Sequence, residues 1–101
     1  MPAYVISDVS LKDDTEAVTA YRTRAADSIA RYGGRYIVRG GSLEALEGNW
    51  LPRMLIVVEF PDIATARAWY KSPEYAQALT FRDKALTRNL LLLDGVLPPQ
   101  V

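Results

Sequence analysis

Hydrophobic and polar side chains alternate along three short stretches of the chain, and a fourth stretch is apolar without alternation. Alternation predicts strands at Ala3–Val9, Arg35–Arg39 and Arg53–Phe60, because successive side chains of a strand point to opposite faces of a sheet. The fourth stretch, Arg88–Val96, contains four consecutive leucines, which is typical of a strand covered on both faces. We therefore expect four strands, with no helix between the second and the third.

Apolar residues at helical spacing predict helices in two segments, one between the first and second strands and one between the third and fourth. The first helix follows a pair of aspartates that suit a helix N-terminus, and it ends at Gly33-Gly34, since glycine adopts the left-handed conformation without a Cβ clash. Its apolar stripe consists of Val18, Tyr21, Ala25, Ile29 and Tyr32. A second helical region covers Ile63–Lys71 and, after a restart at Ser72-Pro73, continues to about Thr87.

This order, β-α-β-β-α-β, predicts an α+β fold of the ferredoxin-like type. We expect a four-stranded antiparallel sheet with helices on one face and with the first and third strands in the centre. Residues 1–96 form one such domain, and residues 97–101 form a C-terminal tail that either frays or reaches another subunit.

Alternation also assigns side chains to the two faces of the sheet. Facing the helices we expect Val5, Val9, Tyr36, Val38, Met54, Ile56, Val58 and Phe60. On the open face we expect Tyr4, Ile6, Asp8, Arg35, Ile37, Arg39, Arg53, Leu55, Val57 and Glu59. The centre of the open face is aliphatic, and a large bare apolar patch is typical of an interaction site, so we expect a second copy to cover it in a homodimer.

The amino-acid composition excludes several classes of active site and binding partner. The chain has no Cys and no His, which excludes thiol nucleophiles, imidazole bases and the usual zinc and haem ligands, and we expect no cofactor and no metal. Twelve basic residues balance twelve acidic ones, so we expect neither nucleic acid nor a membrane surface as a partner. With no signal-type segment and no apolar run long enough to cross a bilayer, we expect a cytoplasmic protein.

One group of charged residues is predicted at one end of the open face. To place side chains along the sheet, we take the first and third strands to run parallel and the second to run against them, which brings Asp8 and Glu59 close to Arg35. Two neighbouring carboxylates can divide into an acid and a base. The same residues can instead form an ion-pair network that fixes the sheet or the dimer, and breaking a buried network by removing Arg35 costs about 3–5 kcal/mol.

A second group is predicted at the opposite end. Arg39 and Arg53 would face the same way on adjacent strands, where like charges repel, so an anion should lie between them. That anion is either a protein carboxylate, such as Glu44 or Glu47, or a bound ligand held by the guanidinium forks, with Tyr4 and Trp50 as its aromatic wall.

Two further features are open to more than one interpretation. Pro2 would become the N-terminal residue if the initiator Met1 is removed, and it falls at the same predicted end of the sheet as Arg39 and Arg53. Tautomerases use such a proline amine as a base beside arginines that bind an acidic substrate. Trp69 flanks the break between the two helical pieces, where it either lines the mouth of a pocket or packs the helices on the sheet.

Taken together, these segments resemble the bacterial family known as domain of unknown function 1330. The resemblance rests on Tyr4-Val5-Ile6, Tyr21, Gly33-Gly34-Arg35-Tyr36, Arg39-Gly40-Gly41, Leu46-Glu47-Gly48, Arg53, Glu59-Phe60-Pro61 and Trp69-Tyr70-Lys71-Ser72-Pro73-Glu74-Tyr75. It implies a dimeric α/β barrel made of two ferredoxin-like sheets. It does not imply an activity, although the wider superfamily includes cofactor-free monooxygenases and lactone isomerases.

Three functional hypotheses follow. The first is a cofactor-free enzyme for a small acidic or aromatic metabolite, with Arg39 and Arg53 orienting it, Glu59 or Asp8 as acid and base, and Tyr4 donating a hydrogen bond. The second is a non-catalytic protein that binds a small anion through the same arginines. The third is a module that serves only dimerisation.

Overall fold

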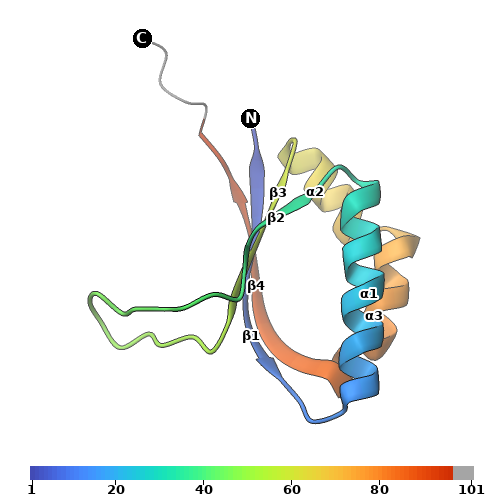
Figure 1. Ribbon diagram of the computed structural model, residues 1–101. Coiled ribbons are helices and arrows are strands. Elements are labelled where there is room, and N and C mark those ends of the chain that lie inside the picture. Colours follow the sequence, from blue (N-terminus) through green and yellow to red (C-terminus); the bar gives the residue numbers. More distant parts are fainter. Residues whose placement is uncertain (97–101) are drawn as a thin grey trace.

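Four antiparallel strands form one sheet in the order β2-β3-β1-β4, with the helices packed against one face (Figure 1). The computed structural model describes residues 1–96, so the predicted tail at 97–101 lies outside the described residues. The strands are β1 (Ala3–Leu11), β2 (Arg35–Arg39), β3 (Leu55–Phe60) and β4 (Leu86–Asp94); the helices are α1 (Thr15–Arg31), α2 (Ile63–Tyr70) and α3 (Pro73–Ala85). This is the α+β architecture and strand order that the sequence predicts.

The direction assumed for the two central strands is wrong. β1 and β3 run antiparallel, with Tyr4 opposite Glu59 and Asp8 opposite Leu55. The reason is that β2 and β3 follow each other as an antiparallel pair, whereas the crossover through α1 returns the chain parallel to β1. Every side chain of β3 therefore lies at the opposite end of the sheet from where the parallel arrangement would put it.

A β-bulge in β2 alters the predicted faces as well. Tyr36 pairs with Val58, but Val38 pairs with Val57, so Ile37 is an extra residue without a partner in the register. Past the bulge the alternation is shifted by one. Val38 moves to the open face, where 43% of it is exposed, and Arg39 moves to the face that the helices cover.

The predicted helix ends are mostly confirmed. The Asp14 carboxylate caps α1 by accepting a hydrogen bond from the Ala17 amide, and the helix is followed by Gly33 with a φ of 73°. Ser72 caps α3 in the same way. However, α3 ends at Ala85 rather than near Thr87, because the chain from Leu86 onward pairs with an end of β1 that extends to Leu11.

The core lies between the sheet and the helices. Its centre is an aromatic stack in which Trp69 packs on Phe60 and on Tyr75, with ring centroids 5.3 Å and 4.2 Å apart. The opposite face of the sheet has no helix on it, and the connection between β2 and β3 extends away on that side as a long arm (Figure 1). No helix within residues 1–96 is long and apolar enough to cross a membrane.

Candidate functional site

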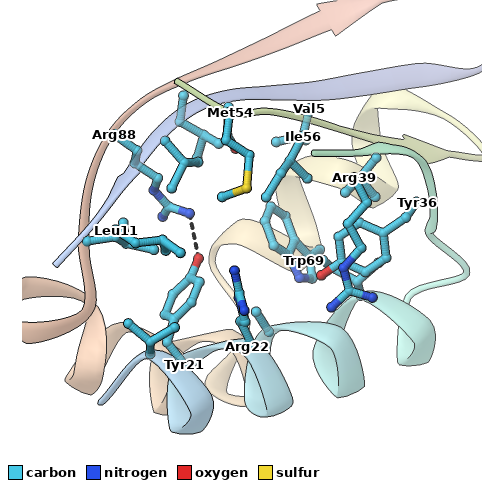
Figure 2. Close-up of a pocket in the computed structure, with 18 residues that line it drawn as sticks. Val5, Leu11, Tyr21, Arg22, Tyr36, Arg39, Met54, Ile56, Trp69 and Arg88 are labelled. Carbon is cyan, nitrogen blue, oxygen red and sulfur yellow. Dashed lines mark hydrogen bonds between the residues drawn. The ribbon is translucent and has the colours of Figure 1, made fainter. Parts of the chain in front are cut away.

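A cavity of about 370 Å³ lies between the sheet and the helices. Its floor comes from the helix-facing residues of all four strands, and its roof comes from α1 together with the buried ring of Trp69 (Figure 2). The lining is largely aliphatic and includes Val5, Val9, Val18, Ile29, Ile56 and Leu90. Such a volume and such walls are typical of sites for small molecules.

Three arginines from three separate elements line this cavity, namely Arg22 of α1, Arg39 of β2 and Arg88 of β4 (Figure 2). No Asp or Glu of the described chain is part of the lining. Within residues 1–96 the salt bridges join Arg35 to Glu59 and Arg82 to Asp83, and neither involves a cavity arginine. Because guanidinium groups remain protonated in proteins, the cavity carries a concentrated positive charge.

Arg88 is held in place by two phenols. One of its terminal nitrogens donates a hydrogen bond to the hydroxyl of Tyr21 and the other to the hydroxyl of Tyr75. The two hydroxyls are also hydrogen-bonded to each other, with their oxygens 2.8 Å apart. Burial raises the pKa of the Tyr21 phenol, and its proximity to Tyr75 raises that pKa further, while the charge of Arg88 lowers it only in part. Tyr21 is therefore neutral at physiological pH and cannot neutralise Arg88.

Arg39 and Arg22 lie near another phenol, that of Tyr36. The guanidinium carbon of Arg39 stacks 4.2 Å from the centroid of the Tyr36 ring, a contact that is possible only because the bulge puts both residues on one face. Burial raises the pKa of Tyr36, and the charges of Arg39 and Arg22 partly oppose that rise. Both cations are thus close enough to act electrostatically on the same hydroxyl group.

Trp69 completes the wall of the cavity. Only 3% of it is exposed, and its indole N–H donates to the hydroxyl of Ser28 across 3.0 Å. It lines the cavity as a fixed aromatic surface while it also packs α2 against the core. Trp69 therefore lies where it both lines a pocket and packs the helices on the sheet, so its position fits each of the two interpretations.

The first predicted charged group is only partly formed. Arg35 and Glu59 do pair across the strands at 2.9 Å, on the open face. Asp8 lies at the other end of the sheet, so the predicted carboxylate pair of Asp8 and Glu59 is wrong. Because 72% of the Arg35 side chain is exposed, the pair belongs to the surface class, which stabilises a protein by about 0–1 kcal/mol, and the larger cost given for a buried network does not apply.

The second predicted group is not formed. Arg39 lies on the helix-covered face, whereas Arg53 is exposed before β3 begins, so the two do not face each other. Tyr4 is opposite Glu59 at the far end of the sheet. Trp50, in the arm, donates its indole N–H to the carboxylate of Asp8 across 3.1 Å instead of forming a wall with Tyr4.

The predicted position of Pro2 beside the arginines is also wrong. The carbonyl of Pro2 accepts a hydrogen bond from the Gly95 amide at 2.7 Å, and the next residue, Ala3, pairs with Phe60. Arg39 pairs with Ile56 instead, near the opposite end of β3. Within this chain, the proline and the arginines of a tautomerase-like site are not brought together.

Sequence reasoning missed Arg22 and Arg88. A signal existed for Arg88, because it alternates with Leu86 and Leu90 and therefore shares their helix-facing side once the strand is known to begin at Leu86. Arg22 follows Tyr21 and lies four residues after Val18, at the margin of the apolar stripe of α1. At such a margin a long side chain can reach either solvent or the sheet, and the sequence does not decide between them.

Comparison with known proteins agrees with the fold and leaves the activity open. The family model named Domain of unknown function (DUF1330) matches residues 2–96. The crystal structure of RPA0582 from Rhodopseudomonas palustris, a protein of unknown function, is 23% identical with a TM-score of 0.73 over 96% of this chain and 84% of that one. A search of curated proteins finds no match.

Two more distant structures share the fold. A "putative antibiotic biosynthesis monooxygenase" from Nitrosomonas europaea is 20% identical with a TM-score of 0.56, over 96% of this chain and all of that one. A dimeric ferredoxin-like protein of unknown function from Bacteroides fragilis is 14% identical with a TM-score of 0.52, over 93% and 96% of the two chains. At these identities the similarity shows the ferredoxin-like fold.

Proposed function

The chain belongs to the DUF1330 family, and we propose that it binds a small organic carboxylate with an apolar or aromatic body in the cavity between sheet and helices. The observation that carries this proposal is the presence of three arginines, and no carboxylate of the described chain, in the lining of an otherwise aliphatic cavity. The proposal keeps the predicted ligand class and two predicted residues, Arg39 and Trp69, and it replaces Arg53 by Arg22 and Arg88.

Physical chemistry favours an anionic occupant. Arg88 is half-buried among apolar side chains, where a cation loses hydration and regains that free energy only from an anion or from hydrogen-bond acceptors. Arg88 donates to two phenols but retains further N–H groups, and the guanidinium of Arg39 stacks on the Tyr36 ring without a salt bridge to a carboxylate of residues 1–96. Carboxylates match the planar guanidinium fork and give hydrogen bonds to charged groups, which contribute about 1.5–3 kcal/mol each.

The fluorescence of Trp69 provides a direct test. The chain has two tryptophans, so Trp50→Phe leaves only the one that lines the cavity. In that background we expect benzoate to change the emission saturably, and we expect the uncharged isostere benzamide to bind at least tenfold more weakly. Arg39→Gln should weaken benzoate binding by about 10- to 100-fold, the equivalent of one lost charged hydrogen bond.

Arg35→Gln is the matched control. Arg35 is on the same strand as Arg39 but on the open face and largely exposed, so its loss should leave the affinity for benzoate unchanged. Equal affinity for benzoate and benzamide would contradict the proposal. So would an equal loss of affinity in the Arg35 and Arg39 variants, because the effect would then come from net charge alone.

A second candidate function is catalysis without a cofactor, and the hydrogen bonding of Tyr21 favours it. Tyr75 is fully buried, and its hydroxyl contacts only the Tyr21 oxygen and the donor Arg88 in the described chain, so its proton goes to Tyr21. The proton of Tyr21 is then available for a ligand in the cavity. A neutral phenol beside a guanidinium can donate a hydrogen bond to the enolate oxygen that forms when solvent water takes the α-proton of a bound substrate, and solvent then returns a proton to that carbon.

This second candidate is tested with phenylpyruvate in D2O. Enolisation would exchange its methylene protons for deuterium, which proton NMR follows directly. We expect exchange faster than in buffer alone, reduced in Tyr21→Phe while binding is retained. Exchange at the same rate with and without the protein would exclude enolisation and leave the binding function in place. The predicted acid and base residues, Glu59 and Asp8, and the predicted donor Tyr4 lie on the open face, so they take no part in this cavity.

We also propose that the chain forms a homodimer through the open face of its sheet. Exposed apolar side chains of that face include Val38, Leu91 and Leu93, and the arm adds exposed Leu46, Trp50 and Leu51. A contiguous apolar surface of this kind is typical of a subunit interface. The Bacteroides fragilis neighbour with this fold is described as dimeric, which supports the proposal.

A further inference from the structure

Two of the cationic groups of the cavity lie at separate ends. Arg39 is on β2, one edge of the sheet, and Arg88 is on β4, the other edge. Three steps between neighbouring strands separate these edges, which amounts to about 14 Å between the two backbones. In the register, Arg39 shares its row with Ile56, Ser7 and Leu90, so Arg88 is also displaced by two residues along β4.

Each arginine is anchored at its own end. The Arg39 guanidinium stacks on Tyr36 of the same strand, and the Arg88 guanidinium is bound to Tyr21 and Tyr75 from the helices (Figure 2). The two cannot converge on a single carboxylate without giving up these contacts. Arg22 reaches into the cavity from α1 and lies between the Arg88 and Arg39 side chains (Figure 2). The positive charge therefore has an Arg88 end and an Arg39 end, with Arg22 between them on the helix side of the cavity.

The sheet side of the space between the two ends is apolar. Ile56, Met54, Leu90 and the ring of Trp69 line the cavity, and the whole cavity has a volume of about 370 Å³. An aromatic ring or a short aliphatic chain can lie against this apolar wall, where a charged group would find no partner.

Building on the proposed function, we propose that the ligand is a dicarboxylate whose two acidic groups are separated by an apolar body. Arg88 binds one carboxylate and Arg39 binds the other, while Arg22 adds positive charge from the helix side of the cavity. The body lies over the sheet against Trp69. This arrangement selects for ligand length as well as charge, because only a body that spans the two ends allows both carboxylates to bind at once.

Isothermal titration with two matched probes tests this inference. 1,4-Phenylenediacetate carries two carboxylates on one ring, and 4-methylphenylacetate has the same ring with one carboxylate replaced by hydrogen. We expect the diacid to bind at least tenfold more tightly than the monoacid. Arg39→Gln should remove that advantage, because both probes then depend on the Arg88 end and the second carboxylate of the diacid no longer has Arg39 to bind. Arg35→Gln, on the other face, should change neither affinity.

The outcomes separate the two proposals. Equal affinities of the diacid and the monoacid, or an advantage that survives Arg39→Gln, would overturn the two-ended site while the carboxylate-binding function stands. Binding of neither probe, together with no response to benzoate, would overturn both. Arg39 is exposed, so its replacement does not threaten the fold, and the comparison needs no variant of the buried network around Arg88.

Discussion

Gly34 shows how closely single atoms are fitted in this core. A Cβ at this position would lie 2.7 Å from a ring carbon of Phe60 and 2.8 Å from a methyl carbon of Ile29. Both neighbours are core side chains that cannot move into solvent. Glycine is required here for close packing between the end of α1 and β3, whereas Gly33 is required for its backbone conformation.

We therefore expect Gly34→Ala to lower the free energy of unfolding by about 1–3 kcal/mol, the usual cost of overpacking. Urea denaturation followed by circular dichroism measures it. Gly41→Ala is the control, because a Cβ there meets no atom within 4 Å and its φ is not positive, so its effect should stay within about 0.5 kcal/mol. Equal stability of the two variants would show that the Phe60 and Ile29 side chains can give way.

At the scale of the elements, two local arrangements decide where the cavity charges lie. The bulge at Ile37 rotates the end of β2 and brings Arg39 under α1. The hydrogen bonds among Tyr21, Tyr75 and Arg88 tie α1, α3 and β4 together. The phenols of Tyr21 and Tyr75 have a structural role, because they hold the helices on β4. They also hold Arg88 in position for its role in the proposed ligand site.

This network predicts a loss of stability in alkali. Burial raises the pKa of Tyr21 above the 10.0 of a free phenol, so as the pH rises the unfolded chain loses this proton before the folded chain does. The contribution of Tyr21 to the free energy of unfolding is thus constant below pH 10, and above pH 10 it decreases by at most about 1.4 kcal/mol per pH unit. Urea midpoints at pH 8, 9.5 and 11 measure the decrease.

Tyr21→Phe is the control for other alkaline transitions. This variant should be less stable at pH 8, because it lacks the hydrogen bonds to Tyr75 and Arg88, but its midpoint should fall less steeply above pH 10 than that of the wild type. Parallel curves for the two proteins would show that Tyr21 does not hold its proton more tightly in the folded state.

At the scale of the whole molecule, the sheet has one covered face and one bare face. The covered face contains the cavity, and the bare face carries exposed leucines together with the arm between β2 and β3. If a second copy covers the bare face, ligand binding and dimerisation take place on opposite sides of the same sheet. The two functions can then be altered separately.

We expect Leu91→Asp to convert the dimer into a monomer. Leu91 is 61% exposed and pairs with Ile6 on the bare face, where the proposed interface would bury a carboxylate without a partner. Light scattering after size-exclusion chromatography gives the mass. Thr23→Asp, on the solvent side of α1, should leave the mass unchanged. A wild-type protein of monomer mass at high concentration, or a Leu91 variant of dimer mass, would contradict the proposed interface.

Local patterns in the sequence were enough to predict the fold, and they also indicated the class of ligand that we propose. Alternation, helical spacing and the glycine and proline signals are local properties, so they predicted the strands, the helices, the cap residues near Asp14 and Ser72, and the bare apolar face. The absence of Cys and His limited the chemistry, and the arginines indicated an anion.

Which residues meet depends on contacts between distant segments of the folded chain. Strand direction put Asp8 and Glu59 at opposite ends of the sheet, and one unpaired residue at Ile37 moved Arg39 to the other face. Neither effect can be read from local pattern, because pairing register depends on contacts between distant segments, and a shift of one residue exchanges the two faces of a strand. The meeting of Arg39 with cations from a helix and from the far edge strand exists only once the chain has folded, since no pattern in the sequence links them.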